Sequence, residues 1–191
     1  MGSVATIPNL VSAVRILLIP AFIWLVVADE TAWAGLLLGV IGSTDWVDGY
    51  LARKLDQVTE VGKMLDPVAD RLAVAIAVVL GLIAGVLPPW LAWAIIVREL
   101  LIGIGAVYGW ANGVRRIDVR WLGKAATLLL YVGVTWLYIA DGLGSDVLWW
   151  IAMGFAVPGV VLYYIVGLDY FRDMRSAIAA DRGASGEGDD R

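Results

Sequence analysis

Long apolar segments separated by short polar links make up most of this chain. Six segments are long enough for a helix to cross the hydrocarbon core of a membrane, which takes about 20 residues. They cover residues 9–28, 32–53, 62–86, 89–111, 121–140 and 147–169. Because backbone amides cannot stay unpaired in lipid, each segment is predicted to be a helix. The pattern therefore predicts an all-α integral membrane protein with six transmembrane helices in one bundle.

The links and the C-terminal residues predict the domain organisation. The links at 29–31, 87–89 and 141–144 are short and rich in turn-forming residues. The chain after residue 178 is rich in Gly, Asp and Arg, a composition that is typical of disorder. We therefore expect one membrane domain over residues 1–178 and a disordered acidic cytoplasmic tail over residues 179–191.

Composition supports a membrane protein and limits its chemistry. Hydrophobic residues make up 61% of the 191 residues and the mean hydropathy is +0.82, whereas a soluble domain is only about half apolar. The chain has no cysteine and no histidine, which excludes disulfides, thiolate metal sites and a cysteine nucleophile. Any reaction must therefore use Asp, Glu, Lys, Arg, Ser, Thr or Tyr side chains, helped by bound ions.

Basic residues gather at alternate links, and this asymmetry predicts the orientation. They are Arg53, Lys54 and Lys63 at one link, Arg115, Arg116, Arg120 and Lys124 at another, and Arg172, Arg175, Arg182 and Arg191 after the last segment. The positive-inside rule then places both termini and both basic links in the cytoplasm. Tryptophans are expected at the two membrane interfaces. The outer group is Trp33, Trp90, Trp149 and Trp150, and the inner group is Trp110 and Trp121.

Four aspartates on two neighbouring segments form the most informative pattern in the chain. Asp45 and Asp48 lie in the second segment, and Asp66 and Asp70 lie in the third. With about 3.6 residues per helical turn, each pair shares one helix face. With a rise of about 1.5 Å per residue, antiparallel helices bring Asp45 level with Asp70 and Asp48 nearly level with Asp66. The four carboxylates are expected to converge in the cytoplasmic half of the membrane.

Such a cluster requires compensating positive charge. Each carboxylate costs about 2.5–3.5 kcal/mol near the centre of a span, and four carboxylates together repel one another. The single positive charge of Arg53 is too little to compensate four carboxylates, so divalent cations are expected. An all-oxygen ligand set favours Mg²⁺ or Mn²⁺, with Ca²⁺ as an alternative. Two ions about 3.5–4 Å apart would clamp a diphosphate for in-line attack. A solvated charge cluster at a helix–loop–helix turn is the simpler alternative, but four Asp on two facing stripes argue against it.

The same residues carry a resemblance to a known family. The run Asp-x-x-Asp-Gly-x-x-Ala-Arg, eight residues and then Gly-x-x-x-Asp-x-x-x-Asp resembles the signature of the CDP-alcohol phosphatidyltransferases. Its fixed positions are filled here by Asp45, Asp48, Gly49, Ala52, Arg53, Gly62, Asp66 and Asp70. The six-segment plan extends the resemblance over nearly the whole chain.

The resemblance implies a six-helix homodimer in the bacterial inner (cytoplasmic) membrane, with a cavity that faces the cytoplasm. Asp45, Asp48 and Asp66 would bind metal, and Asp70 would bind metal and act as the general base. The CDP site would be lined by Asp48, Gly49, Ala52, Arg53, Gly62 and Asp66. The acceptor hydroxyl would attack the phosphorus of CDP-diacylglycerol that carries the diacylglycerol, and CMP would leave. No nucleic-acid partner is expected.

Other positions narrow the acceptor alcohol. Residues 7–15, 98–99 and 123–127 resemble the branch that contains phosphatidylglycerophosphate synthases and actinobacterial-type cardiolipin synthases. In the former, a second Arg stands at the position of Ala106 and a second Lys at that of Ala126. Both differences make this site less basic, which favours phosphatidylglycerol, a monoanionic diester, as the acceptor. Glycerol 3-phosphate, with its dianionic phosphate, is the alternative.

Four residues are candidates for acceptor binding, namely Arg98, Glu99, Lys124 and Arg116. Arg98 and Glu99 lie about ten residues from either end of the fourth segment, so both should face the bundle interior. They form either a wall of the acceptor cavity or a structural ion pair, and the sequence leaves both open. Lys124 and Arg116 also fit the plain positive-inside pattern.

Other functions and contacts fit part of the pattern. A cation transporter would use the four Asp as an ion path, although the acidic residues toward the outer side lie in loops, and a non-catalytic scaffold would not need them. Metal-dependent CMP release distinguishes an enzyme from both.

Gly81–Gly85 and Gly105–Gly109 have the spacing of close helix contacts, either within the bundle or at a dimer interface.

Overall fold

The computed structural model describes the backbone of residues 7–55, 60–111 and 121–186, and the side chains over 16–44, 72–105 and 121–169 with a few positions beside them. Within these ranges the chain forms six helices and no strand. They are α1 (Ile7–Val27), α2 (Thr31–Leu55), α3 (Glu60–Ile83), α4 (Pro89–Ala111), α5 (Trp121–Gly142) and α6 (Asp146–Gly186). Each helix coincides with one predicted segment to within a few residues, except at the end of α6. The predicted all-α fold is therefore confirmed.

Two helix ends differ from the prediction. Helix α3 ends at Ile83 because Gly85 has a φ of 78°, in the left-handed region where glycine commonly terminates helices. Gly85 is thus a turn residue with no neighbour near its missing Cβ, and it does not form a packing pair with Gly81. Helix α6 continues to Gly186, past the expected boundary at residue 178, and the division into a membrane domain and a tail stays a prediction.

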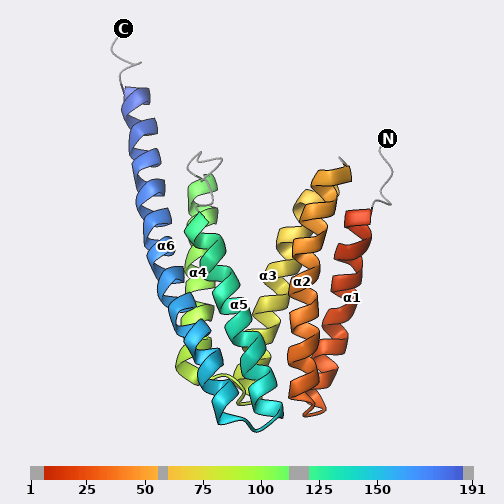
Figure 1. Ribbon diagram of the computed structural model, residues 1–191. Helices are drawn as coiled ribbons and strands as arrows, with labels where there is room; N and C mark the ends of the chain where they lie inside the picture. Colours follow the sequence, from red (N-terminus) through yellow and green to blue (C-terminus); the bar gives the residue numbers. More distant parts are fainter. Residues whose placement is uncertain (1–6, 56–59, 112–120, 187–191) are drawn as a thin grey trace.

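The helices form two groups that meet at one end. Helices α1, α2 and α3 lie on one side of the bundle, and α4, α5 and α6 lie on the other (Figure 1). The groups approach each other where the three short turns lie, and they diverge toward the end at which α1 begins and α6 ends (Figure 1). Helix α5 packs along α6 and also contacts α2 and α3. It is therefore the element that joins the two groups.

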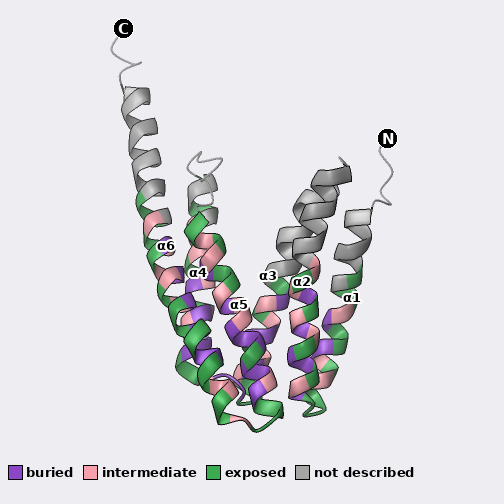
Figure 2. Cartoon of the chain, in the orientation of Figure 1, coloured by how far each residue is buried: buried purple, intermediate pink, exposed green. Residues whose placement is uncertain are grey.

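Close approach of helix backbones builds the core around α5. A Cβ added at Gly133 would lie 2.7 Å from the backbone nitrogen of Ala156, and one added at Gly159 would lie 2.8 Å from that of Leu130. Small residues allow this kind of close contact between membrane helices. Among the described residues, buried side chains from all six helices form one core (Figure 2). This core supports the helices that carry the Asp residues.

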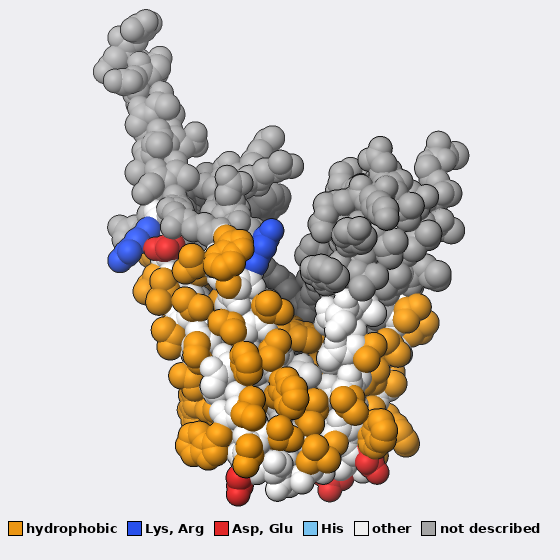
Figure 3. Space-filling view, in the orientation of Figure 1, with side chains coloured by type: hydrophobic (Ala, Val, Ile, Leu, Met, Phe, Trp, Pro, Cys, Tyr) orange, Lys and Arg blue, Asp and Glu red, His pale blue; other side chains and the backbone are white. Residues whose placement is uncertain are grey.

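Charged and apolar side chains are segregated on the outer surface. On the face seen in Figure 3, exposed hydrophobic side chains cover the described part of the bundle. Acidic side chains lie at the end with the turns, and Lys and Arg side chains lie near the opposite edge of the described part. The end with the turns carries Asp29, Glu30, Asp141 and Asp146. Among the described residues, two helical segments are long and apolar enough to cross a membrane by length and composition. They are Trp121–Gly142 and Asp146–Asp169.

Most of the tryptophans expected at the outer interface lie on the surface near the turns. Trp33, Trp90 and Trp150 are exposed, whereas Trp149 is half-buried and meets Trp150 edge-on at 4.9 Å between ring centroids. Trp121 is exposed at the opposite end of α5, and the side chain of Trp110 lies outside the described residues. Their depth in a membrane stays a prediction.

Candidate functional site

The four aspartates lie on the two helices expected to carry them. Asp45 is fourteen residues from the first residue of α2, and Asp70 is thirteen from the last residue of α3. At about 1.5 Å per residue, both therefore lie about 20 Å along their helices from the end with the turns. Asp48 and Asp66 are each seventeen residues from the same ends, or about 25 Å. The helix bounds are therefore compatible with the predicted pairing of Asp45 with Asp70 and of Asp48 with Asp66, which stays a prediction.

The side chains of the signature residues lie outside the described ones, so their contacts stay a prediction. These residues are Asp45, Asp48, Gly49, Ala52, Arg53, Gly62, Asp66 and Asp70. The chemistry of the donor set fits a hard divalent cation such as Mg²⁺ or Mn²⁺, because it consists of four carboxylates in a chain without His or Cys. Among the described side chains, no group of three or more acidic residues lies together in a way that could hold a metal ion.

Tyr131 of α5 reaches across to α2. Its hydroxyl donates a hydrogen bond to the backbone carbonyl of Leu38. Its ring lies where a side chain at Gly42 would be, since a Cβ there would come 2.2 Å from the ring atom Cε1. Gly42 therefore makes room for the ring, and the hydroxyl reaches the carbonyl one helical turn before it.

Tyr138, two turns along α5, makes the same type of contact with α3. Its hydroxyl donates a 2.7 Å hydrogen bond to the backbone carbonyl of Ala77. A Cβ at Gly81 would lie 3.0 Å from that hydroxyl oxygen and 2.4 Å from Leu87. A glycine one turn after the acceptor carbonyl thus again makes room for a tyrosine. This explains Gly81 as a contact within the bundle, one of the two alternatives for that position.

Arg98 and Glu99 of α4 face α6. The Arg98 guanidinium donates a 2.9 Å hydrogen bond to Glu99 Oε1, and its carbon Cζ lies 3.2 Å from the centroid of the Tyr163 ring. The Tyr163 hydroxyl donates a hydrogen bond to the same Glu99 oxygen. Arg98 is buried, and its Nε has no hydrogen-bond partner among the described residues. This arrangement joins two helices and supports the structural ion pair, the alternative left open for these residues.

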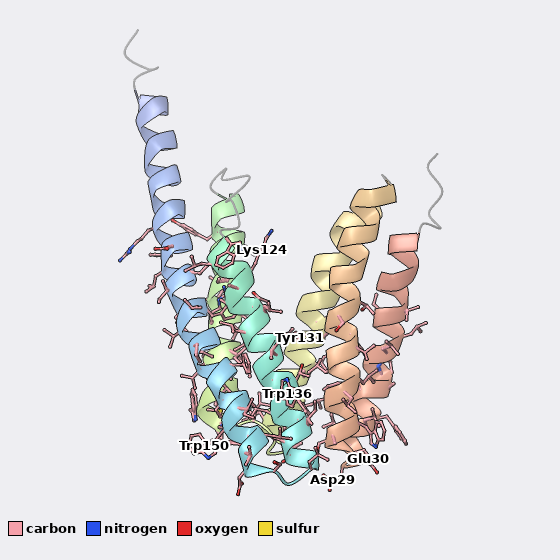
Figure 4. All side chains as sticks on the ribbon, viewed as in Figure 1. Asp29, Glu30, Lys124, Tyr131, Trp136 and Trp150 are labelled. Carbon is pink, nitrogen blue, oxygen red and sulfur yellow. The ribbon has the colours of Figure 1, made fainter. Side chains whose placement is uncertain are left out.

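The remaining acceptor candidates have different environments. Lys124 is exposed on α5 and points away from α6, toward the side on which α2 and α3 lie (Figure 4). Arg116 and the side chain of Ala106 lie outside the described residues. Ala126 is 0% exposed and belongs to the packed core. A small side chain at Ala126 is therefore explained by helix packing, which weakens the inference drawn from the missing Lys at this position.

Comparison with known proteins decides the family. Residues 5–162 match the family model described as CDP-alcohol phosphatidyltransferase. The chain belongs to the CDP-alcohol phosphatidyltransferase family. It is therefore a phosphatidyltransferase enzyme of a membrane protein family, and neither a transporter nor a scaffold is needed to explain its carboxylates.

Relatives named for two different activities match most of the length of this phosphatidyltransferase. The cardiolipin synthase (CMP-forming) of Streptomyces coelicolor is 36% identical, over 93% of this chain and 86% of the relative. The putative cardiolipin synthase of Mycobacterium tuberculosis is 35% identical, over 84% of this chain and 78% of the relative. The CDP-diacylglycerol–glycerol-3-phosphate 3-phosphatidyltransferase of Bacillus subtilis is 34% identical, over 86% and 93% respectively.

Sequence reasoning missed the tyrosine contacts of this phosphatidyltransferase, although a signal for them was present. Tyr131 and Tyr138 are seven residues apart and so lie on one face of a helix. Gly35, Gly39 and Gly42 lie on one face of α2, and a Cβ at Gly39 would lie 3.4 Å from Thr135 of α5. Paired stripes of this kind on two segments predict that the segments pack together.

Proposed function

We propose that this phosphatidyltransferase transfers the phosphatidyl group of CDP-diacylglycerol to a hydroxyl of phosphatidylglycerol, forming cardiolipin and CMP. The observation that carries the proposed reaction is the complete family signature, which is divided between α2 and α3. The relatives named as cardiolipin synthases support this acceptor. Glycerol 3-phosphate is the second candidate, because relatives named for it match at similar identity.

In the proposed reaction the chain binds, orients and deprotonates its substrates. Asp45, Asp48, Asp66 and Asp70 would hold two Mg²⁺ or Mn²⁺ ions, which neutralise and polarise the diphosphate when they are bound. Gly49, Ala52, Arg53 and Gly62 would line the CDP site together with Asp48 and Asp66. Glycine lets a ligand approach the backbone closely, and arginine pairs well with phosphate oxygens.

The transfer itself is a substitution at phosphorus. The acceptor hydroxyl oxygen bonds to the phosphorus that carries the diacylglycerol, while the bond from that phosphorus to the CMP oxygen breaks. The acceptor proton passes to an Asp70 carboxylate oxygen, which acts as the general base. CMP leaves with the electron pair of the broken bond.

We propose Lys124 as an acceptor-binding residue, and its position on α5 supports this role. It precedes Tyr131 by seven residues and therefore shares the face of α5 that contacts α2. Tyr131 stands opposite Gly42 of α2, and α2 and α5 are antiparallel. Lys124, two turns beyond Tyr131, therefore comes about level with Gly49, one residue after Asp48, where an ammonium group would pair with the acceptor phosphate.

We further propose that the enzyme is a multi-pass protein of the bacterial inner membrane, with the site and both termini on the cytoplasmic side. The acidic turn end supports this orientation, since the Lys and Arg side chains visible in Figure 3 lie away from it, toward the opposite end. A homodimer is proposed from the family alone. The open space at Gly105 of α4, near the exposed Ile104 and Val107, is compatible with a partner surface.

The acceptor is tested with purified enzyme in liposomes that contain CDP-diacylglycerol and Mg²⁺ or Mn²⁺. Phosphatidylglycerol or glycerol 3-phosphate is added, CMP is quantified, and the lipid product is identified by mass. The proposal predicts CMP and cardiolipin with phosphatidylglycerol. Release with glycerol 3-phosphate alone would overturn the acceptor and leave the family reaction in place.

A further inference from the structure

We propose that Tyr131 and Tyr138 are positioning residues that hold α2 and α3 at the separation required by the metal site. The inference rests on the proposed function for the identity of the metal ligands. The two contacts themselves are described directly, because each hydroxyl donates a hydrogen bond to a backbone carbonyl of one of the two helices that carry the aspartates.

The two contacts lie at equal distances from the predicted ligands. The acceptor carbonyl on α2, Leu38, precedes Asp45 by seven residues. The acceptor carbonyl on α3, Ala77, follows Asp70 by seven residues. Seven residues are about two turns, or about 10.5 Å along a helix. Each contact therefore supports its helix about two turns from the nearer aspartate, on the side of the bundle where the short turns lie.

One continuous helix carries both tyrosines. Tyr131 and Tyr138 are two turns apart on α5, which is unbroken from Trp121 to Gly142, so their side chains leave the same face. Movement of α2 relative to α3 would have to break at least one of the two hydrogen bonds or displace α5. Helix α5 is in turn packed closely on α6 through Gly133 and Gly159.

The hydroxyls add a constraint that ring packing alone does not supply. A hydrogen bond has a narrow range of distance and angle, and a buried hydroxyl without a partner is unfavourable. Apolar surfaces can slide past one another with little loss of contact, whereas these bonds specify one height for each helix. Because Mg²⁺ demands near-ideal geometry at about 2.1 Å, a small shift of one helix against the other is expected to weaken binding.

The test uses hydroxyl deletions that keep the rings, Tyr131→Phe and Tyr138→Phe, in full-length protein in lipid nanodiscs. Mn²⁺ binding is measured by electron paramagnetic resonance of the free ion. We expect the dissociation constant to rise on the order of 10-fold, the lower end of the effect of losing an outer-shell partner. Since Tyr138 is fully buried and Tyr131 is only partly so, Tyr131→Phe carries the test alone if the other variant does not fold.

Tyr164→Phe is the matched control. The Tyr164 hydroxyl donates a 2.8 Å hydrogen bond to the carbonyl of Ala94, which joins α6 to α4. Its removal deletes the same kind of bond from helices that carry none of the four aspartates. We expect Tyr164→Phe to bind Mn²⁺ with the affinity of the unaltered protein.

A second readout measures helix separation directly. The chain has no native cysteine, so spin labels attached through Val40→Cys and Leu72→Cys, both exposed positions, report the distance between α2 and α3. We expect that distance distribution to broaden or shift in Tyr131→Phe and to stay unchanged in Tyr164→Phe.

The outcomes separate this inference from the proposed function. The positioning role alone would be overturned if the Mn²⁺ affinity and the α2–α3 distance stay unchanged in Tyr131→Phe. It would also be overturned if both quantities change equally in Tyr164→Phe. Absence of CMP release from the unaltered protein would overturn the proposed function instead, since neither readout depends on turnover.

Discussion

The hydroxyl of Tyr138 donates a 2.7 Å hydrogen bond to the backbone carbonyl of Ala77, joining α5 to α3. The same side chain meets Phe22 of α1 edge-on, with 5.4 Å between ring centroids. Tyr138 thus connects three helices within the core of the described residues. Helices α2 and α3 continue from this core to the aspartates, so the site depends on how well the core is packed.

Packing between α2 and α5 is tested at Gly35. A Cβ there would lie 2.7 Å from Ile139 Cγ1 and 2.9 Å from the backbone nitrogen of Ile139, so part of the conflict is with backbone that cannot rotate away. Gly35→Ala is expected to lower the free energy of unfolding by roughly 1–3 kcal/mol. Thermal unfolding in detergent, followed by tryptophan fluorescence, measures the change.

Gly154→Ala is the control for this substitution. Gly154 lies in α6, is exposed, and has no heavy atom within 4 Å of the position of an added Cβ. Because Ala has a higher helix propensity than Gly, the free energy of unfolding of the Gly154→Ala variant should be unchanged or higher by up to about 1 kcal/mol. Equal destabilisation of the two variants would contradict the described α2–α5 contact.

The lengths of the apolar segments were enough to predict six helices. A span must be long enough for the membrane and must satisfy its own backbone hydrogen bonds, so its position follows from local composition. The signature likewise assigns Asp45 and Asp48 to one helix and Asp66 and Asp70 to the next, because spacing and helix geometry decide faces and heights. These features depend on short stretches of chain.

Contacts between distant segments were not predicted. The position of Tyr131 over Gly42 depends on which faces of α2 and α5 meet, and hydropathy does not distinguish that face from one that contacts lipid. Arg98 and Glu99 show the same limit. Their depth predicts burial, but the Tyr163 side chain that contacts them belongs to α6, more than sixty residues away in the sequence.

The two kinds of acceptor candidate should respond differently to substitution. Arg98→Ala removes one partner of Glu99 and the cation on the Tyr163 ring. It should lower the free energy of unfolding by roughly 1–3 kcal/mol, less than for a fully buried pair because Glu99 is partly exposed. Lys124→Ala should leave stability unchanged and raise the KM for the acceptor. Unfolding and steady-state kinetics of both variants make the comparison, and the reverse pattern would place Arg98 in the acceptor site.

Orientation is measurable because the chain has no native cysteine. Leu143→Cys lies in the α5–α6 turn and Arg172→Cys lies toward the other end of the bundle, and both positions are exposed. A membrane-impermeant maleimide added to intact spheroplasts should label Leu143→Cys and leave Arg172→Cys unlabelled until the cells are lysed. Labelling of Arg172→Cys in intact spheroplasts would contradict a cytoplasmic site.

Metal binding is expected to depend on the charge of each signature aspartate. Asp45→Asn keeps the size of the side chain but removes its charge, so the Mn²⁺ dissociation constant should rise on the order of 10-fold or more. Asp146→Asn, at the acidic end with the turns, is the matched control and should bind Mn²⁺ with the affinity of the unaltered protein. Titration of Mn²⁺ into purified protein distinguishes them, and equal affinities would remove Asp45 from the ligand set.

The central claim is that the four aspartates support metal-dependent phosphatidyl transfer, and CMP release from CDP-diacylglycerol measures this most directly. Purified protein in liposomes with phosphatidylglycerol should release CMP when Mg²⁺ or Mn²⁺ is present and stop when the ion is chelated. Asp70→Asn, which cannot accept the proton, should reduce release to background. Release that continues in Asp70→Asn, or that is unaffected by chelation, would contradict the assigned site.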